Sequence, residues 1–304
     1  MSVQTKAWLA LIFICLAWGT TYFGIKIALG AFPPFLMAGI RQFIAGLIIF
    51  LMAFSNKLKK DFSINNILRQ ALIGFLLITL GNGLVSWAEV YIPSGVAALI
   101  CAVIPIATVV VSLMIQKNEK VNIIIIVGMV LGFLGVAINF KDSIGVIGQQ
   151  QYTIGIFAVF IATLAWAFGT VISKRNPKDT NPIFNSAIQV TAGGILLLPF
   201  SLAFDNYQNI HLENTQGLLG VLYLIIIGSV LAYTVYMYAL KHLPIGVVMI
   251  YSYINPLVAI LLGWWLANEP LNLYTFISFT CIISGLLVVY KGYKKLATKK
   301  IIVA

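Results

Sequence analysis

Two stretches decide the fold of this chain: LAWGTTYFGIK at residues 16–26 and LAWAFGTVISK at residues 164–174. They stand 148 residues apart, and each opens on Leu-Ala-Trp and closes on a lysine. A second echo follows further along, where Pro93-Ser94-Gly95-Val96 reappears as Pro244-Ile245-Gly246-Val247. The chain is therefore predicted to consist of two copies of one unit, residues 1–150 and residues 151–304.

The stretches around these motifs are too apolar for a water-soluble domain. Of the 304 residues, 61% are hydrophobic and 9% are charged, whereas soluble domains carry roughly 25% charged residues. A membrane-spanning helix needs about 20 apolar residues. The sequence predicts ten such helices, at 7–29, 35–54, 68–91, 93–116, 122–140, 153–173, 183–204, 217–240, 245–267 and 272–290.

The predicted fold class is an all-α polytopic membrane protein in which two five-helix repeats are inverted relative to each other. Because five is an odd number, the second copy enters the bilayer from the opposite side. Inverted repeats are typical of alternating-access transporters, whose binding site lies near the midplane between the halves. With this topology, 16 of the 19 Lys and Arg residues fall on one side and one falls on the other. By the positive-inside rule, both termini are predicted to be cytoplasmic in a multi-pass protein of the cytoplasmic membrane.

Several classes of function find no support in the sequence. The net charge of +11 comes from residues in short loops, so no nucleic-acid partner is expected. Cys15, Cys101 and Cys281 lie in apolar segments, where they are interpreted as small apolar residues. Of the two histidines, His211 lies in an outside loop and His242 ends the eighth helix. The sequence has no metal-ligand cluster, no pair of carboxylates and no nucleotide-binding motif. We therefore expect no catalytic residue, no metal and no cofactor.

The expected partners are a small-molecule substrate and the lipid bilayer, with a homodimer left open. Gly128, Gly132 and Gly135 would allow a neighbouring helix to approach closely. This spacing favours packing within one chain over a dimer contact.

Several of these motifs also resemble a known family. Leu16-Ala17-Trp18-Gly19 with Lys26 resembles the opening motif of the EamA family in the drug/metabolite transporter (DMT) superfamily. Three further stretches resemble the bacterial inner-membrane metabolite-exporter subgroup of this family: Gly81 to Ala98, Gly228 to Tyr238, and Tyr251 to Pro256.

The resemblance covers essentially the whole chain. It implies ten helices around a central cavity between helices 1, 3, 4, 6, 8 and 9, and export of small metabolites, frequently amino acids. The alternatives are an importer or facilitator of a similar solute, or an integral membrane enzyme acting on lipid-linked substrates.

Aromatic and polar side chains at helical spacing are the candidate substrate-binding residues. Trp18 and Tyr22 share one face of the first helix, and Trp166 and Thr170 share the corresponding face of the sixth. Ordinary aromatic packing is the alternative for both tryptophans. The remaining candidates lie on helices 3, 8 and 9, and they are Asn82, Ser86, Tyr233, Tyr236, Tyr251 and Asn255.

Charged residues and prolines inside the spans are the candidates for gating, coupling and helix breaking. Lys26 and Glu89 are both expected about 28 Å above the cytoplasmic ends of their helices, so an outer salt bridge between them is predicted. Arg41, whose repeat partner is Gln189, is interpreted as a structural pairing residue, with binding of a substrate carboxylate as the alternative. Pro105 and Pro256 each remove a backbone donor and are predicted to break helices 4 and 9 beside the site.

Overall fold

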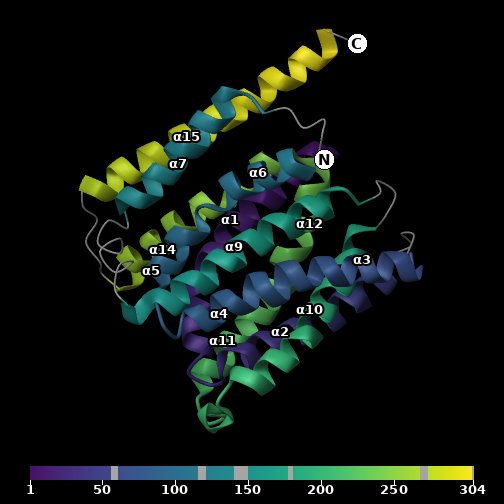
Figure 1. Cartoon of the computed structure of the whole chain (residues 1–304), viewed down its shortest axis with the longest axis vertical. Coiled ribbons are helices and arrows are strands. Elements are labelled where there is room, and N and C mark those ends of the chain that lie inside the picture. The colour runs from purple at the N-terminus through teal and green to yellow at the C-terminus, as the bar shows by residue number, and fades with distance from the viewer. Residues whose placement is uncertain (56–60, 116–120, 140–149, 177–180, 268–272, 303–304) are drawn as a thin grey trace.

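The computed structural model describes residues 1–55, 61–115, 121–139, 150–176, 181–267 and 273–302 (Figure 1). Within these ranges every regular element is a helix. Eight helices are long and apolar enough to cross a membrane, and two shorter apolar helices bring the total to ten. The predicted all-α fold class with ten spans is confirmed.

The first five spans contain eight elements. These are α1 (Val3–Ala28), α2 (Pro34–Ser55), α3 (Ile64–Gly74), the π-helix η1 (Phe75–Gly83), α4 (Leu84–Ala88), α5 (Ser94–Cys101), α6 (Ile104–Ile115) and α7 (Ile123–Asn139). The third span is thus α3, η1 and α4 in series, and the fourth is α5 followed by α6.

The second five spans follow the same plan, after the 3₁₀ turn η2 (Gln150–Tyr152). Their elements are α9 (Thr153–Lys174), α10 (Pro182–Phe204), the 3₁₀ turn η3 (Tyr207–Asn209), α11 (Thr215–Tyr223), the π-helix η4 (Leu224–Leu231), α12 (Ala232–His242), α13 (Ile245–Val248), α14 (Tyr251–Ala267) and α15 (Leu273–Ile302). A π-helical segment therefore interrupts the third span of each repeat.

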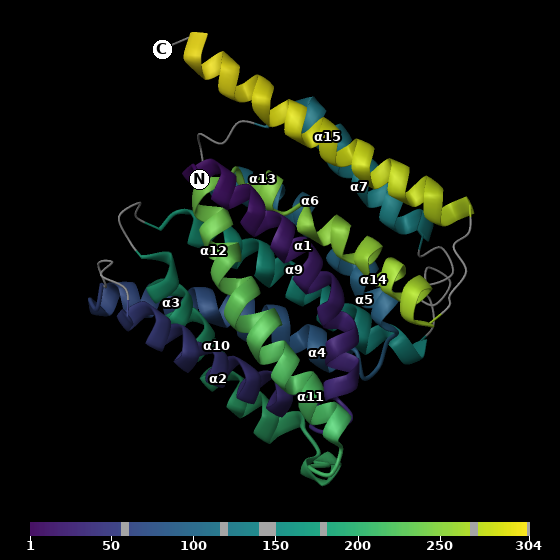
Figure 2. The same cartoon turned by 180° about the vertical axis from the view of Figure 1, so that it is seen from behind.

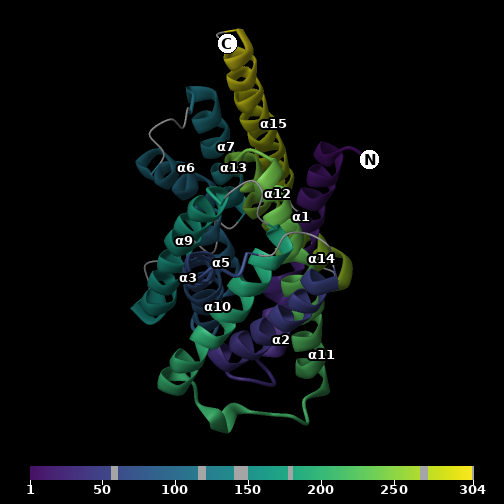
Figure 3. The same ribbon diagram turned by 90° about the vertical axis from the view of Figure 1, so that its right-hand side faces the viewer.

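The helices form one bundle with two ends (Figures 2 and 3). The end where α1 begins and α15 ends is called the terminal end, and the opposite end is called the distal end. The pair α7 and α15 lies along one edge of the bundle, beside the body formed by the other helices (Figure 1). At the opposite edge α2 packs along α10.

Glycines make these two edge pairs possible. A Cβ atom on Gly128 would lie 2.8 Å from the carbonyl oxygen of Gly285, and one on Gly285 would lie 2.7 Å from the backbone nitrogen of Gly132. The glycine motif of helix 5 thus packs α7 against α15 within the chain, as predicted. In the other pair, a Cβ atom on Gly194 would lie 2.6 Å from the backbone nitrogen of Phe43.

Candidate functional site

A cavity of about 80 Å³ lies between the two repeats. A buried water needs at least about 10–15 Å³ on this scale, so the cavity has room for several water molecules or a small solute. Its lining residues are Trp18, Thr21, Tyr22, Ile25, Gly81, Asn82, Val85, Cys101, Ile104, Ala162, Thr163, Trp166, Tyr251, Ser252 and Asn255. The lining residues of α1, η1, α4 and α5 stand in the distal halves of their spans, those of α9 stand near the middle, and those of α14 stand in the terminal half. The cavity therefore lies near the middle of the bundle.

Three aromatic side chains of the cavity lining, Trp18, Trp166 and Tyr251, form a cluster with Tyr236, which is buried outside the lining. The Trp18 ring lies 5.6 Å from Trp166, 5.1 Å from Tyr236 and 4.8 Å from Tyr251, measured between ring centroids. Trp166 and Tyr251 each also contact Tyr236, in both cases at 5.9 Å. The two tryptophans that head the duplicated motif therefore meet at the interface between the repeats.

The π-helical segment η4 fixes the orientation of Trp18. The indole Nε1–H of Trp18 donates a hydrogen bond of 3.0 Å to the carbonyl oxygen of Gly228, within η4. A π-helical turn departs from the i→i+4 pattern and is frequent at functional sites. Gly228 also allows α1 to approach, because a Cβ atom there would lie 3.1 Å from the methyl group of Thr21.

Six of the ten residues predicted to bind substrate line the cavity: Trp18, Tyr22, Asn82, Trp166, Tyr251 and Asn255. The other four are buried outside its lining. Ser86 donates to the carbonyl oxygen of Asn82 at 3.0 Å, and Thr170 is hydrogen-bonded to Tyr236 at 2.7 Å. Tyr233 donates to Gln189 at 2.7 Å. Whether any of the ten binds substrate stays a prediction.

Sequence reasoning did not name nine of the lining residues, and six of these are apolar residues, glycine or cysteine. Ile25 and Val85 are apolar, and Cys101 was interpreted as an apolar packing residue. Helical spacing alone contained the missing signal for Thr21 and Ile25, which lie on the same face of α1 as Trp18. No comparable pattern points to Cys101, which reaches the cavity through the path of α5 and α6.

Arg41 and Gln189 occupy equivalent positions in the two repeats and make equivalent contacts. Arg41 is 2% exposed on α2, and its guanidinium donates to the Asn82 side chain at 2.5 Å. Gln189, fully buried on α10, accepts from Tyr233 and donates to Gln70 at 2.6 Å. The Arg41–Asn82 and Gln189–Tyr233 contacts each tie the second span of a repeat to its third span, whereas the Gln189–Gln70 contact joins the two repeats. The structural role of Arg41 stays a prediction.

Glu89 and Lys26 occupy different environments. The Glu89 side chain is 6% exposed, and its charge interacts electrostatically with Arg41, Tyr22 and Cys101. The Lys26 side chain is exposed at the distal end of α1 and makes no hydrogen bond or ion pair with the residues that the structure describes. The predicted Lys26–Glu89 salt bridge is thus absent from this conformation, and a gating role for either residue stays a prediction.

At the terminal end, side-chain contacts join α9 to α12. The Ser173 hydroxyl donates to the Met237 sulfur at 3.3 Å. One turn closer to the cavity, Thr170 contacts Tyr236. The Lys174 ammonium donates to the carbonyl oxygens of Leu240 at 2.5 Å, Leu243 at 2.7 Å and Lys241 at 3.5 Å. These contacts close the bundle between α9 and α12.

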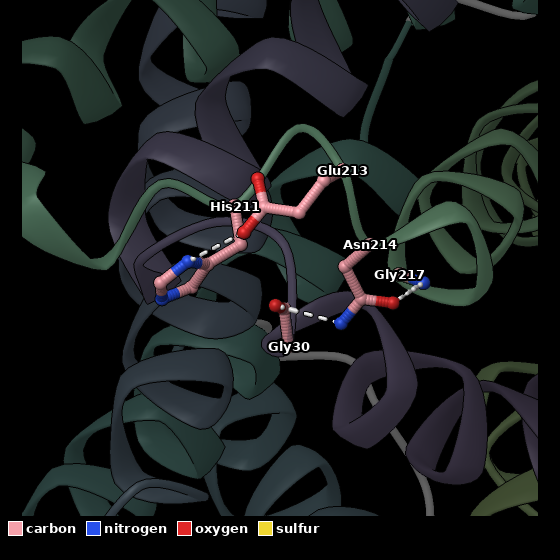
Figure 4. Close-up of polar contacts among 5 residues, drawn as sticks. All are labelled: Gly30, His211, Glu213, Asn214 and Gly217. Carbon is pink, nitrogen blue, oxygen red and sulfur yellow. Dashed lines mark hydrogen bonds and ion pairs between the residues drawn. The ribbon is translucent and has the colours of Figure 1, made fainter.

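At the distal end, the segment between α10 and α11 holds the turn that follows α1 (Figure 4). Asn214, the N-cap of α11, accepts from the Gly217 amide at 3.0 Å and donates to the Gly30 carbonyl at 2.9 Å. The side chains of His211 and Glu213 are exposed, and the His211 Nδ1 atom is hydrogen-bonded to the Glu213 carboxylate at 3.2 Å beside this contact. A backbone hydrogen bond and this histidine hold the pKa of Glu213 below its usual value.

The helix breaks lie near the two prolines but are not equivalent. In the first repeat the turn at Ala102 and Val103 separates α5 from α6, and Pro105 occupies the first turn of α6. In the second repeat the turn at 249–250 precedes α14, so Pro256 lies inside that helix. The turn thus ends two residues before Pro105 and six residues before Pro256, and a helix-breaking role for either proline stays a prediction.

The fold and cavity together define a multi-pass membrane protein with its candidate site between two repeats. The family model of the EamA-like transporter family matches residues 5–141 and 153–291. The chain belongs to the EamA-like transporter family.

Named relatives agree with this assignment. The chain is 33% identical to the uncharacterized inner membrane transporter YedA of Escherichia coli (strain K12), over 93% of this chain and 90% of that protein. It is 26% identical to the uncharacterized transporter YoaV of Bacillus subtilis (strain 168), over 93% and 96% of the two chains. A solved crystal structure of a protein that is 18% identical shares the fold, with a TM-score of 0.79 over 96% of this chain and 99% of that one.

Proposed function

We propose that this protein is a secondary transporter that exports small metabolites, amino acids or related compounds among them, across the cytoplasmic membrane by alternating access. The observation that carries the proposal is the asymmetry of the cavity between two equivalent repeats. Residues of α1, η1 and α4 line it in the first repeat, while the equivalent helices α9 and α12 of the second repeat are joined by hydrogen bonds. A central site between inverted repeats whose equivalent helices are arranged differently supports alternating access.

The chemistry of the cavity supports a small amphipathic solute. The rings of Trp18, Trp166 and Tyr251 offer flat apolar surfaces, and Asn82 and Asn255 offer amide groups. Pockets of this kind gain affinity from apolar contact and orientation from a few polar groups. The direction of transport is supported by the resemblance to the metabolite-exporter subgroup.

Transport is tested with purified protein in proteoliposomes, using a panel of amino acids and related solutes with and without a pH gradient. We expect saturable movement of at least one solute, and its dependence on the gradient will decide proton coupling. Modification of a lipid-linked substrate without solute movement would overturn the proposal in favour of an enzyme. Uptake against a gradient into right-side-out vesicles would replace export with import.

The proposed orientation predicts opposite locations for two loops. Because 16 of the 19 Lys and Arg residues fall on one side, reporter fusions near residue 60 should be cytoplasmic and fusions near residue 210 should be periplasmic or extracellular. The loop at 56–60 lies outside the described residues. Paired alkaline phosphatase and fluorescent-protein fusions measure this, and the same side for both loops would contradict the topology.

A further inference from the structure

Lys174 and Lys26 occupy equivalent positions in the two repeats, yet their surroundings differ. Each lies in the last turn of the helix that carries the cavity tryptophan, at the terminal end for Lys174 and at the distal end for Lys26. Lys174 donates to carbonyl oxygens at the end of α12, whereas Lys26 is exposed. The last carbonyls of a helix have no intrahelical donor and carry its partial negative charge, so an ammonium group there is favourable.

The repeat also identifies the residues at the distal end that correspond to those whose carbonyl groups bind Lys174. Pro93 corresponds to Pro244, a spacing of 151 residues. With the same spacing, Leu240, Lys241 and Leu243 correspond to Glu89, Val90 and Ile92, which follow the end of α4. The carbonyl oxygens of these three residues therefore form the equivalent place for Lys26 when α1 and α4 come together.

The positions between the lysines and the tryptophans differ in the same way. On α9, Thr170 is hydrogen-bonded to Tyr236 of α12. Their counterparts Tyr22 and Val85 both line the cavity. At this position the first and third spans are therefore hydrogen-bonded in the second repeat, whereas in the first repeat both residues border the cavity.

A second set of contacts is present at both ends at once, so it does not distinguish the two ends. Asn214 at the start of α11 holds Gly30 beyond α1 at the distal end. At the terminal end, Arg69 and Gln70 near the start of α3 hold the end of α9, through the Ile172 carbonyl at 3.2 Å and the Asn176 side chain at 3.2 Å. The lysine contacts differ from this set, because Lys174 makes them at the terminal end and Lys26 does not make them at the distal end.

We propose that Lys26 and Lys174 are alternating latches: Lys174 closes the terminal end by binding the carbonyls of Leu240 and Leu243, and Lys26 closes the distal end by binding those of Glu89, Val90 and Ile92. This proposal rests on the alternating access of the proposed function. It places the partner of Lys26 on the backbone at the end of α4, not on the Glu89 carboxylate. The protein in this structure has its terminal latch closed and its distal latch open.

The test measures which end is open without any substrate. Single cysteines at Val85→Cys, in the cavity lining, and at Ser173→Cys, in the closed terminal contact, are labelled with a membrane-impermeant maleimide in vesicles of both orientations. The background replaces the native thiols by alanine, and they are Cys15, Cys101 and Cys281. The latch variants are Lys174→Met and Lys26→Met, which keep the side-chain stem and remove the charge.

Loss of the terminal latch should shift the protein toward the state that is open at the terminal end. We expect Lys174→Met to raise Ser173→Cys labelling and lower Val85→Cys labelling, each by about tenfold, as the loss of a charge-assisted hydrogen bond would produce. Lys26→Met should shift both rates in the opposite direction, and Lys174→Arg should restore most of the wild-type behaviour. Lys6→Met, an exposed lysine on the same helix as Lys26, is the matched control and should change neither rate.

The outcomes separate the latch from the function on which it rests. If wild-type protein labels from one end only, even when a solute gradient is imposed, alternating access itself fails. If both ends label and the two latch variants behave like Lys6→Met, or shift the protein in the same direction, the latch proposal is overturned. Addition of Glu89→Gln should act independently of Lys26→Met, whereas a non-additive effect would assign the contact to the Glu89 carboxylate.

Discussion

Transport by the Trp18→Ala variant is expected to fall at least tenfold, with a similar loss for Trp166→Ala. Trp18 contacts three aromatic rings and donates to the Gly228 carbonyl, so truncation to alanine removes these contacts and part of the cavity lining. One well-placed aromatic contact is worth about 0.5–1.5 kcal/mol, and about 1.4 kcal/mol changes an affinity tenfold. The measurement is the initial rate of solute flux in proteoliposomes with equal amounts of folded protein.

The tryptophan prediction needs a control for folding, because truncation of a buried tryptophan to alanine costs about 3–5 kcal/mol of stability. Trp18→Phe keeps a flat ring but loses the indole donor and part of the ring surface, so it should retain more stability than Trp18→Ala and part of the transport rate. Trp8→Ala is the matched control on the same helix, since Trp8 contacts Tyr290 at 5.8 Å, away from the cavity. Wild-type transport by folded Trp18→Ala and Trp166→Ala proteins would remove both residues from the site.

Gly46→Ala should lower the stability of the protein more than Gly39→Ala, although both glycines lie on α2 and face α10. A Cβ atom at Gly46 would stand 2.1 Å from the Thr191 hydroxyl oxygen and 2.7 Å from the Thr191 backbone nitrogen. The nearest atoms to a Cβ at Gly39 are 3.5 Å away, which is ordinary contact. Overpacking a tight interface costs about 1–3 kcal/mol, whereas alanine in an open helical position gains up to about 1 kcal/mol over glycine.

The glycine prediction is checked by thermal unfolding in detergent and by the monodispersity of the purified variants. We expect a clear fall in melting temperature for Gly46→Ala and an unchanged or slightly raised value for Gly39→Ala. Equal melting temperatures for the two variants would mean that α2 and α10 do not cross at Gly46 as described.

The sequence was sufficient to predict the membrane class, the ten spans and the duplication. Long apolar runs cannot be solvated by water, and a buried backbone in lipid must form helices, so these features follow from local composition. Part of the cavity lining was also predicted from local sequence. Trp18, Tyr22 and Trp166 carry a helical period that any straight helix would place on one face.

Other features depend on contacts between distant parts of the chain, and periodicity does not report these. The π-helical segments η1 and η4, the break before α14 and the burial of Glu89 near Arg41 are examples. In each case the backbone or side-chain position is set by a neighbouring span, as Gly228 of η4 is by the Trp18 indole. A residue's own helix contains no information about that neighbour.

The sequence by itself determined that Lys26 and Lys174 are equivalent, because the repeat aligns them at the ends of two homologous helices. Only the tertiary structure decided that Lys174 is bound to the end of α12 while Lys26 is exposed. Two copies of one unit have the same local preferences, so sequence cannot assign different states to them. The difference between the two lysines is set by the spans packed around each of them, and that is a property of the folded molecule.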